Sequence, residues 1–180
     1  MKKKREDFHM KSIIIAFSGK PGSGKSTLSK IISERLNAVY LRIDTIEEFL
    51  NKRCQIKVGK KDYEFSQVIA LDNLRLGNIV VSDGCNYSEA TRNGWEEVAK
   101  NANCKCLNVE VVCSDNNVRR NRLAERHYDL SSDVIDEIMK EPFEEWAKDK
   151  ERLIIDTISN SIDDCVNKII EIVNMEINVV

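Results

Sequence analysis

Short apolar runs and helical stripes alternate along almost the whole chain. The first run is Ile13-Ile14-Ile15-Ala16-Phe17, and similar runs follow at residues 38–43, 79–81, 107–113 and 153–156. Apolar runs of this length, without regular polar positions, are typical of strands that are buried on both faces. The pattern therefore predicts five buried strands.

The intervals between these runs carry apolar residues at helical spacing. One face of a helix is formed by Leu28, Ile31, Ile32 and Leu36, which recur at positions i, i+3, i+4 and i+8. Comparable stripes predict helices at about residues 46–50, 62–76, 88–102, 132–139 and 162–173, and one more after Ser114 or Asp115. Because strands alternate with helices, we expect an α/β fold with a parallel sheet covered on both faces.

The link between the first strand and the first helix is rich in glycine. It consists of Gly19, Lys20, Pro21, Gly22, Ser23, Gly24, Lys25 and Ser26, followed by Thr27. The link matches G-x-x-x-x-G-K-[ST] at every fixed position, in the strand–loop–helix context that a phosphate-binding P-loop requires. Its glycines let successive N–H groups and the helix N-terminus point at phosphate oxygens. We expect Lys25 to reach the β and γ phosphates and Ser26 to offer its hydroxyl to Mg²⁺.

Composition and charge narrow the class of protein. The chain has 180 residues, of which 42% are hydrophobic and 32% charged, and its net charge is −2. These values fit one α/β domain over residues 11–180 and give no bulk reason to expect nucleic acid as a partner. No apolar run is long enough to span a membrane, and no secretory signal follows the basic start. We expect a cytoplasmic location and a flexible tail over residues 1–10.

Six cysteines could indicate disulfides or a metal site. No C-x-x-C pair is present, and only two histidines, His9 and His127, are available as further ligands. The spacing matches no zinc template. We therefore expect reduced thiols, as in cytosolic proteins.

Absent motifs separate this P-loop from several nucleotide-hydrolysing classes. Neither Asn-Lys pair is completed to the N-K-x-D motif that reads a guanine base, and no D-x-x-G follows the second strand. Asp83 is followed by Gly84 rather than by the water-activating glutamate of ABC-type or mechanical ATPases. Phosphoryl transfer to a small acceptor is therefore the best-supported chemistry.

Two carboxylates follow predicted strands, where ligands of parallel sheets gather. Asp44 could accept the proton of an acceptor hydroxyl or hydrogen-bond it, or could serve only as a carboxylate at the start of a helix capped by Thr45. Asp83 could hold Mg²⁺ through a water, or could serve only to form the turn before Gly84. Both are candidates for the active site.

Three arginines share one face of the helix that follows the fourth strand. Arg119, Arg122 and Arg126 are spaced by three and four residues. Guanidinium groups in such a stripe can stack on a base and clamp phosphates. They could also form a solvated face paired with acids such as Asp115 and Glu125, and for Arg119 both interpretations stay open.

Several segments resemble one bacterial protein family. They are Gly19–Thr27, Leu41–Glu47, Asp72–Gly77, Val80–Asp83, Thr91–Trp95, Glu110–Asp115 and Ile154–Thr157. The family is that of AAA-type P-loop small-molecule kinases, similar to adenylylsulfate kinase, gluconate kinase, chloramphenicol phosphotransferase and the zeta-toxin group. The resemblance covers about residues 13–172 and identifies the family without naming a substrate.

The resemblance implies a fold. It is the three-layer P-loop fold of nucleoside monophosphate kinases, with a five-stranded parallel sheet of order 2-3-1-4-5. A lid-like region is expected at about residues 119–141. Residues 127–140 depart from the family pattern, because they lack glycine and predict a helix rather than a flexible cover.

The resemblance also implies roles for single residues. Asp44 would be the substrate-side carboxylate, and Arg92 would face the substrate or the lid. One of Arg122 and Arg126 would stack on adenine while the other contacts phosphates. Thr157 would lie near the adenine, so the nucleotide would be bound by residues 19–27 together with Arg122 and Thr157.

The resulting hypothesis is an ATP- and Mg²⁺-dependent kinase that phosphorylates a hydroxyl of a small metabolite, drug or nucleotide-like acceptor. Lys25, Asp44 and Arg126 are its catalytic candidates, Asp44, Asp83 and Arg92 its substrate contacts, and Ser26 and Asp83 its metal ligands. Two alternatives stay open: an ATP-binding switch or toxin-like protein with slow hydrolysis, and phosphorylation of nucleic-acid 5′ ends through the basic loop 52–61. We expect a monomer or a homodimer.

Overall fold

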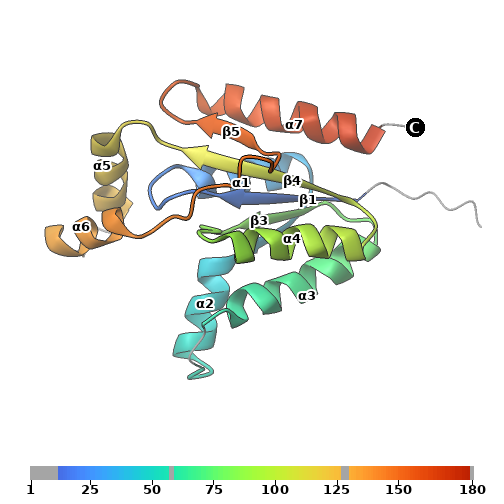
Figure 1. The fold of residues 1–180 in the computed structure, drawn as a ribbon, viewed down its shortest axis with the longest axis horizontal. Helices are drawn as coiled ribbons and strands as arrows, with labels where there is room; N and C mark the ends of the chain where they lie inside the picture. The colour runs from blue at the N-terminus through green and yellow to red at the C-terminus, as the bar shows by residue number, and fades with distance from the viewer. Residues whose placement is uncertain (1–11, 57–58, 127–129, 179–180) are drawn as a thin grey trace, which may run out of the picture.

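A five-stranded sheet forms the centre of the molecule (Figure 1). The computed structural model describes residues 12–56, 59–126 and 130–178, so the tail predicted over residues 1–10 lies outside the described part. The strands are β1 (Ile13–Ser18), β2 (Val39–Arg42), β3 (Val80–Asp83), β4 (Lys105–Val112) and β5 (Leu153–Asp156). They pair in parallel in the order β2-β3-β1-β4-β5. The predicted strands and the strand order are confirmed.

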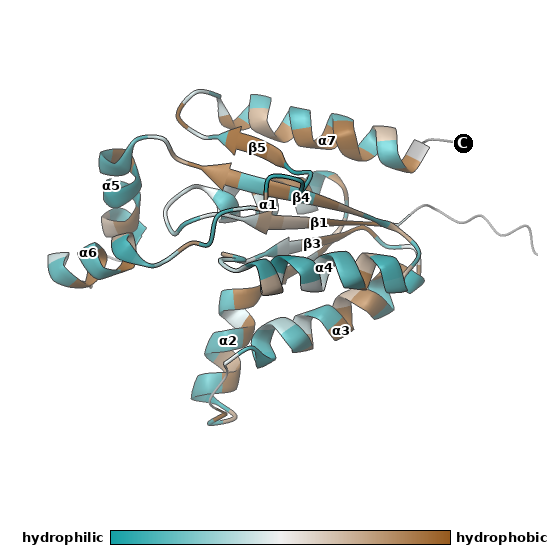
Figure 2. Cartoon of the chain, viewed as in Figure 1, coloured by the Kyte–Doolittle hydropathy of each residue, from teal (hydrophilic) through white to brown (hydrophobic). Residues whose placement is uncertain are grey.

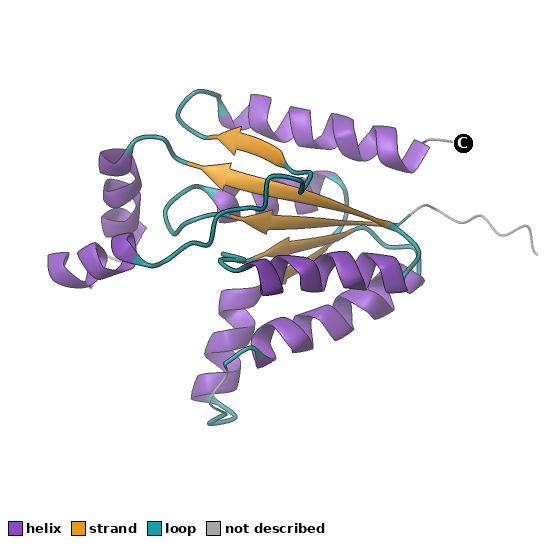
Figure 3. Cartoon of the chain, viewed as in Figure 1, coloured by secondary structure: helices purple, strands orange, loops and turns teal. Residues whose placement is uncertain are grey.

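Helices connect the strands and cover both faces of the sheet (Figure 3). They are α1 (Lys25–Arg35), α2 (Ile43–Lys52), α3 (Lys61–Arg75), α4 (Glu89–Asn101), α5 (Asn116–Arg126), α6 (Ser132–Lys140) and α7 (Ile162–Asn178). In Figure 1, α5 and α6 stand beyond the carboxyl ends of the strands. They make up most of the region at about residues 119–141 that was predicted to be lid-like, and its role as a lid stays a prediction.

The core consists of two apolar layers, one on each face of the sheet. Alternate residues of β1 enter different layers, because successive strand residues point to opposite faces. Ile15 and Phe17 pack with residues of α1 and α7, whereas Ile14 and Ala16 pack with residues of α3 and α4. Figure 2 shows the central strands as largely apolar and the helices as mixed. This explains why the strands form continuous apolar runs in the sequence.

The junction of β2 and α2 differs from the prediction. The strand ends at Arg42, which is extended and forms the N-cap position, and the helix begins at Ile43 rather than after Thr45. Ile43 is buried in the core, against the open side of Gly84, so the chain turns into the helix as soon as this side chain is packed. The predicted cap at Thr45 is wrong, and Asp44 lies in the first helical turn.

Other helix ends follow the predicted signals. Gly77 has a φ of +88° beyond α3, and the Gly77 N–H donates to Leu74 O while the Asn78 N–H donates to Asn73 O. This pair of bonds is the Schellman arrangement that a C′ glycine permits. At the start of α4, the Ser88 hydroxyl accepts from the Thr91 N–H in a capping box. Within residues 12–56, 59–126 and 130–178, no helix combines the length and apolar character needed to cross a bilayer.

Candidate active site

A cavity of about 960 Å³ opens at the carboxyl ends of the strands. The P-loop after β1 lies at its centre, because β1 is the middle strand of the sheet. One half is lined from β2, β3, α2 and α3, and the other from α5 and the segment after β5. The strand order thus divides the cavity into two halves that meet at the P-loop, as expected for a ligand site at a topological switch point.

The P-loop holds the tight conformation that its glycines predict. Gly19 has a φ of +135°, and a side chain there would collide with the backbone of Val111 on β4. The Gly19 N–H donates to Cys85 O over 3.0 Å. Lys25 is the first residue of α1, and its Nζ donates back to Lys20 O over 3.0 Å, so the ammonium group lies across the loop. The arrangement keeps the cation at the point where the two halves of the cavity meet.

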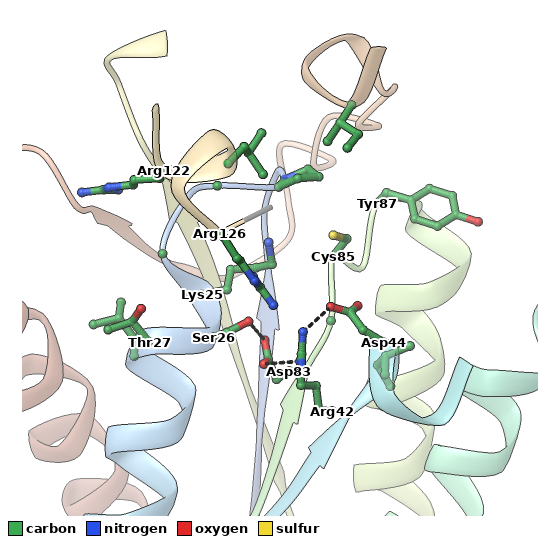
Figure 4. A pocket seen from close by; sticks show the side chains of 18 of the residues that line it. Lys25, Ser26, Thr27, Arg42, Asp44, Asp83, Cys85, Tyr87, Arg122 and Arg126 are labelled. Atoms are coloured by element: carbon green, nitrogen blue, oxygen red, sulfur yellow. Dashed lines mark hydrogen bonds and ion pairs between the residues drawn. The ribbon is translucent and has the colours of Figure 1, made fainter. Parts of the chain in front are cut away.

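Asp83 lines the cavity, and several neighbouring side chains contact its carboxylate (Figure 4). It ends β3 and is only 2% exposed. The Ser26 hydroxyl donates to Asp83 Oδ1 over 3.2 Å, and the Tyr40 hydroxyl donates to Asp83 Oδ2 over 2.6 Å. Both predicted metal residues, Ser26 and Asp83, are therefore brought into direct contact.

Tyr40 was not predicted, and the pairing of β2 with β3 brings it to Asp83. It lies two residues before Arg42 on β2, so both side chains share one face of the strand. In the parallel register Arg42 pairs with Asp83 on β3. Burial, followed by the hydrogen bond to Asp83, raises the pKa of Tyr40. Its hydroxyl therefore stays protonated and remains a donor to the carboxylate.

Asp44 lies in the same cavity, paired with Arg42. Arg42 Nη2 donates to Asp44 Oδ2 over 3.0 Å, and Arg42 Nε lies 3.9 Å from Asp83 Oδ2. The Asp44 side chain is 57% exposed, so solvent and ligands can reach it. Figure 4 shows Asp44 and Asp83 on either side of the Arg42 guanidinium. Arg42 thus links the two predicted carboxylates and was not itself predicted.

The predicted arginine stripe divides into two kinds. Arg122 and Arg126 line the cavity. Arg122 Nη1 donates to Thr157 Oγ1 over 2.8 Å, and Thr157 Oγ1 donates to Ser23 O over 2.9 Å, which connects α5, β5 and the P-loop. Arg119 instead is 6% exposed and donates to Met139 O over 2.9 Å, so it joins α5 to the end of α6. Arg119 therefore fits neither of the two interpretations, because it does not line the cavity and is buried rather than solvated.

Arg92 does not face the cavity, in contrast to the prediction. It is 2% exposed, and its guanidinium donates to three backbone carbonyls, those of Asn86, Glu144 and Glu145. It also lies 4.5 Å from the centroid of the Trp146 ring. The reason is its position on the inward face of α4, where the segment after α6 folds over it. In this structure Arg92 holds that segment in place, and none of the three carbonyls that it binds belongs to a residue lining the cavity.

Several residues of the β2 and β3 half were not predicted. They are Glu47, Glu48, Asp62, Tyr63, Cys85, Tyr87 and Glu141. Tyr63 contacts the buried Asn86, because the backbone N–H of Asn86 donates to the Tyr63 hydroxyl over 3.1 Å. Burial raises the pKa of Cys85, which keeps it a thiol. No motif marks these positions, because they come together only after folding, from α2, α3 and the segments after β3 and α6.

The sequence matches one family model over most of its length. The model is AAA_33, described as an AAA domain, and it matches residues 14–157. The chain therefore belongs to this AAA domain family. The matched residues include the P-loop, Asp44, Asp83 and Thr157.

Individual proteins place the fold more closely. A cytidylate kinase of Sulfolobus acidocaldarius is 37% identical over 68 residues, which cover 34% of this chain and only 37% of that protein. A putative kinase of Chloroflexus aurantiacus has a similar structure, with a TM-score of 0.73, 15% identity and coverage of 94% of this chain and 99% of that one. The Mycobacterium tuberculosis APS kinase CysC, in complex with AMPPNP and APS, gives a TM-score of 0.65 at 15% identity over 91% and 98% of the chains. The fold is that of P-loop kinases.

Proposed function

We propose that the protein is an ATP- and Mg²⁺-dependent kinase that transfers the γ-phosphoryl group to a hydroxyl of a small-molecule acceptor. The observation that carries this proposal is the single cavity in which Lys25 lies between Asp44 on one side and Arg122 on the other (Figure 4). At about 960 Å³ it is at the upper end of the range for small-molecule sites, which suits a nucleotide and an acceptor together. Structures of this fold include one with AMPPNP and APS bound, which supports the same arrangement.

The nucleotide would occupy the P-loop and the half beside α5. Backbone N–H groups of residues 19–27 and the N-terminus of α1 would bind its phosphates, with Lys25 at the β and γ positions. Arg126 extends into the cavity near Lys25 and would neutralise charge on the transferring group (Figure 4). Arg122 and Thr157 would border the base.

The residues beside the P-loop fit Mg²⁺. Ser26 Oγ and a carboxylate oxygen of the buried Asp83 are 3.2 Å apart, and hard oxygen ligands are those that Mg²⁺ prefers. When bound, the ion would be held by Ser26 and Asp83 and would supply positive charge that offsets the charge of the phosphates. Among the described residues, no group of three or more His, Cys, Asp or Glu side chains is arranged so that it could hold a metal ion by itself.

Asp44 would act on the acceptor. Its exposed carboxylate can accept the proton of the attacking hydroxyl, and Arg42 holds it toward the cavity. In the transfer, the acceptor oxygen forms a bond to the γ phosphorus, the bond from that phosphorus to the bridging oxygen of ADP breaks, and the hydroxyl proton passes to Asp44. The missing glutamate after Asp83 fits transfer to an acceptor better than transfer to water.

Changing Asp44 to Asn tests this role. We expect ATP affinity to be unchanged and transfer to fall by roughly two orders of magnitude or more, because an amide cannot take up the proton. ADP release with a panel of hydroxyl acceptors, together with calorimetric AMPPNP binding, measures both effects. Normal transfer by the variant would show that Asp44 is not the base. Tight AMPPNP binding with no acceptor effect in the wild type would favour a nucleotide-binding switch over a kinase.

Changing Tyr40 to Phe tests the support of the metal site. The change removes the donor to Asp83 Oδ2, which lies 2.6 Å away, and leaves the ring in place. One such hydrogen bond contributes about 1 kcal/mol, so we expect the Mg²⁺ concentration for half-maximal turnover to change by about fivefold. A Mg²⁺ titration of ADP release measures it, with Ser26→Ala as the variant expected to shift further. An unchanged Mg²⁺ dependence would mean that Tyr40 serves packing alone.

A further inference from the structure

The half of the cavity beside β2 and β3 is rich in acidic side chains. They are Asp44, Glu47, Glu48, Asp62 and Glu141. Asp44 is paired with Arg42, and Glu48 is paired with Lys52 over 2.7 Å. Within the described residues, Glu47, Asp62 and Glu141 form no ion pair. This half therefore carries carboxylates that no neighbouring cation balances in the described part of the chain.

Asp62 is the buried member of this group. The residue is 5% exposed and lines the cavity from the first turn of α3. Its Oδ1 is buried and has no hydrogen-bond partner among the described residues. A buried carboxylate oxygen without a donor is costly, and most such atoms in folded proteins are paired. A cation bound in the cavity against the Asp62 carboxylate would offset this cost.

The charges of the other carboxylates of this half interact with the charge of Asp62. Burial raises the pKa of Glu47, and the charges of Asp62, Asp44 and Glu141 raise it further. Burial also raises the pKa of Asp62; backbone hydrogen bonds from Tyr63 and from Asp62 itself oppose the rise, and the charge of Asp44 adds to it. The side chains come from α2, α3 and the segment after α6, so folding gathers like charges at one place. A bound cation would relieve this repulsion.

Basic side chains are scarce on the same half. Arg42 is the one described basic residue that lines it, and this guanidinium already lies between Asp44 and Asp83. Arg92, the arginine predicted to contact an acceptor, is buried under the segment after α6. An anionic acceptor would therefore meet several carboxylates and no unpaired cation among the described residues other than those placed at the phosphates.

Resting on the proposed kinase function, we propose that the acceptor is a hydroxylated amine, protonated at neutral pH, whose ammonium group binds between Asp62 and Glu47 while its hydroxyl faces Asp44. An ammonium group supplies three donors, so it can donate to the Asp62 carboxylate and to a second carboxylate at once. Charge-assisted hydrogen bonds of this kind are stronger than neutral ones. Amino sugars, aminocyclitols and amino alcohols belong to this class, whereas nucleoside monophosphates and sugar acids do not.

Matched acceptors that differ in charge test the inference. Each of three sets compares an amine with its N-acetylated form, a neutral analogue and a carboxylate. The first set is D-glucosamine, N-acetyl-D-glucosamine, D-glucose and D-gluconate. The second set is based on 2-aminoethanol and the third on 2-deoxystreptamine. Calorimetry measures the binding of each to the full chain saturated with AMPPNP and Mg²⁺. We expect the amine of at least one set to bind about tenfold or more tightly than its N-acetylated partner, and the carboxylates not to bind. No amine preference in any set, or tighter binding of a carboxylate, would overturn the inference.

Variants of the acidic half locate the preference. Asp62→Asn is expected to weaken binding of the preferred amine by about tenfold or more, because a charge-assisted bond becomes a neutral one. Glu141→Gln should also weaken binding of the preferred amine, but by less. Because Glu141 is exposed, this change should not affect the fold. Glu64→Gln removes one charge from an exposed site on α3 outside the cavity, so the affinity for the preferred amine should be unchanged. Unchanged amine affinity in both folded cavity variants would contradict the proposed site.

ADP release in the same sets separates this inference from the proposed function. Release that depends only on neutral or anionic acceptors would leave the kinase proposal standing and overturn the amine site. If calorimetry shows an amine preference but no acceptor causes ADP release, the ammonium site would be supported and the kinase proposal would not.

Discussion

Changing Lys25 to Ala is expected to lower acceptor-dependent ADP release by roughly three orders of magnitude, the upper range for loss of one preorganised charge at a developing negative charge. The fold should persist, because the only hydrogen bond that the described structure gives to Lys25 Nζ is the one to Lys20 O within the P-loop. The measurements are ADP release at saturating Mg²⁺, AMPPNP affinity by calorimetry and thermal unfolding of the same preparation.

Lys30→Ala is the matched control for this variant. Lys30 lies on the same helix but is exposed and outside the cavity, so its removal changes net charge equally without touching the phosphates. We expect normal ADP release from it. Normal ADP release from both the Lys25 and the Lys30 variant would contradict the P-loop assignment, whereas equal loss in both would indicate a general electrostatic effect.

The fold was predictable because its signals are local. A strand that is buried on both faces appears as an apolar run, and the P-loop glycines are demanded by backbone geometry that few other residues allow, as at Gly19. The error at Thr45 shows the limit of such signals. A capping residue competed with the packing of Ile43 against Gly84, and the packing of the core decided where the helix begins.

The candidate site was predictable only where a motif or a strand end marks it. Lys25, Ser26, Asp44 and Asp83, which the structure places in one cavity, were predicted because each lies at a strand end or belongs to the P-loop. Their partners were not, since contacts such as Tyr40 with Asp83 join residues 43 positions apart. Asp62 gave no signal for a similar reason, because its burial depends on how α2 and α3 pack. Sequence alone therefore predicts the P-loop part of the cavity better than the half beside β2 and β3.

Arg92 is the residue for which the sequence and the structure make opposite predictions. A substrate contact would show as a raised KM in an intact fold. The structure instead predicts that Arg92→Met destabilises the fold by about 4 kcal/mol, because it leaves three carbonyls without their charged donor. For a chain of this size that lowers the thermal midpoint by roughly 10 °C.

Denaturant unfolding combined with steady-state kinetics at low temperature decides between the two. Methionine keeps much of the length and apolar stem of Arg92, so the lost stability reports the guanidinium rather than a cavity. Arg120→Met is the control, since Arg120 lies on the surface and pairs with Asp136, and it should leave the midpoint nearly unchanged. A stable Arg92→Met protein with a raised acceptor KM would restore the substrate role. Alternatively, the variant protein is destabilised but its folded fraction keeps the acceptor KM of the wild type. This result would show that Arg92 acts on the site only by holding the segment after α6 in place.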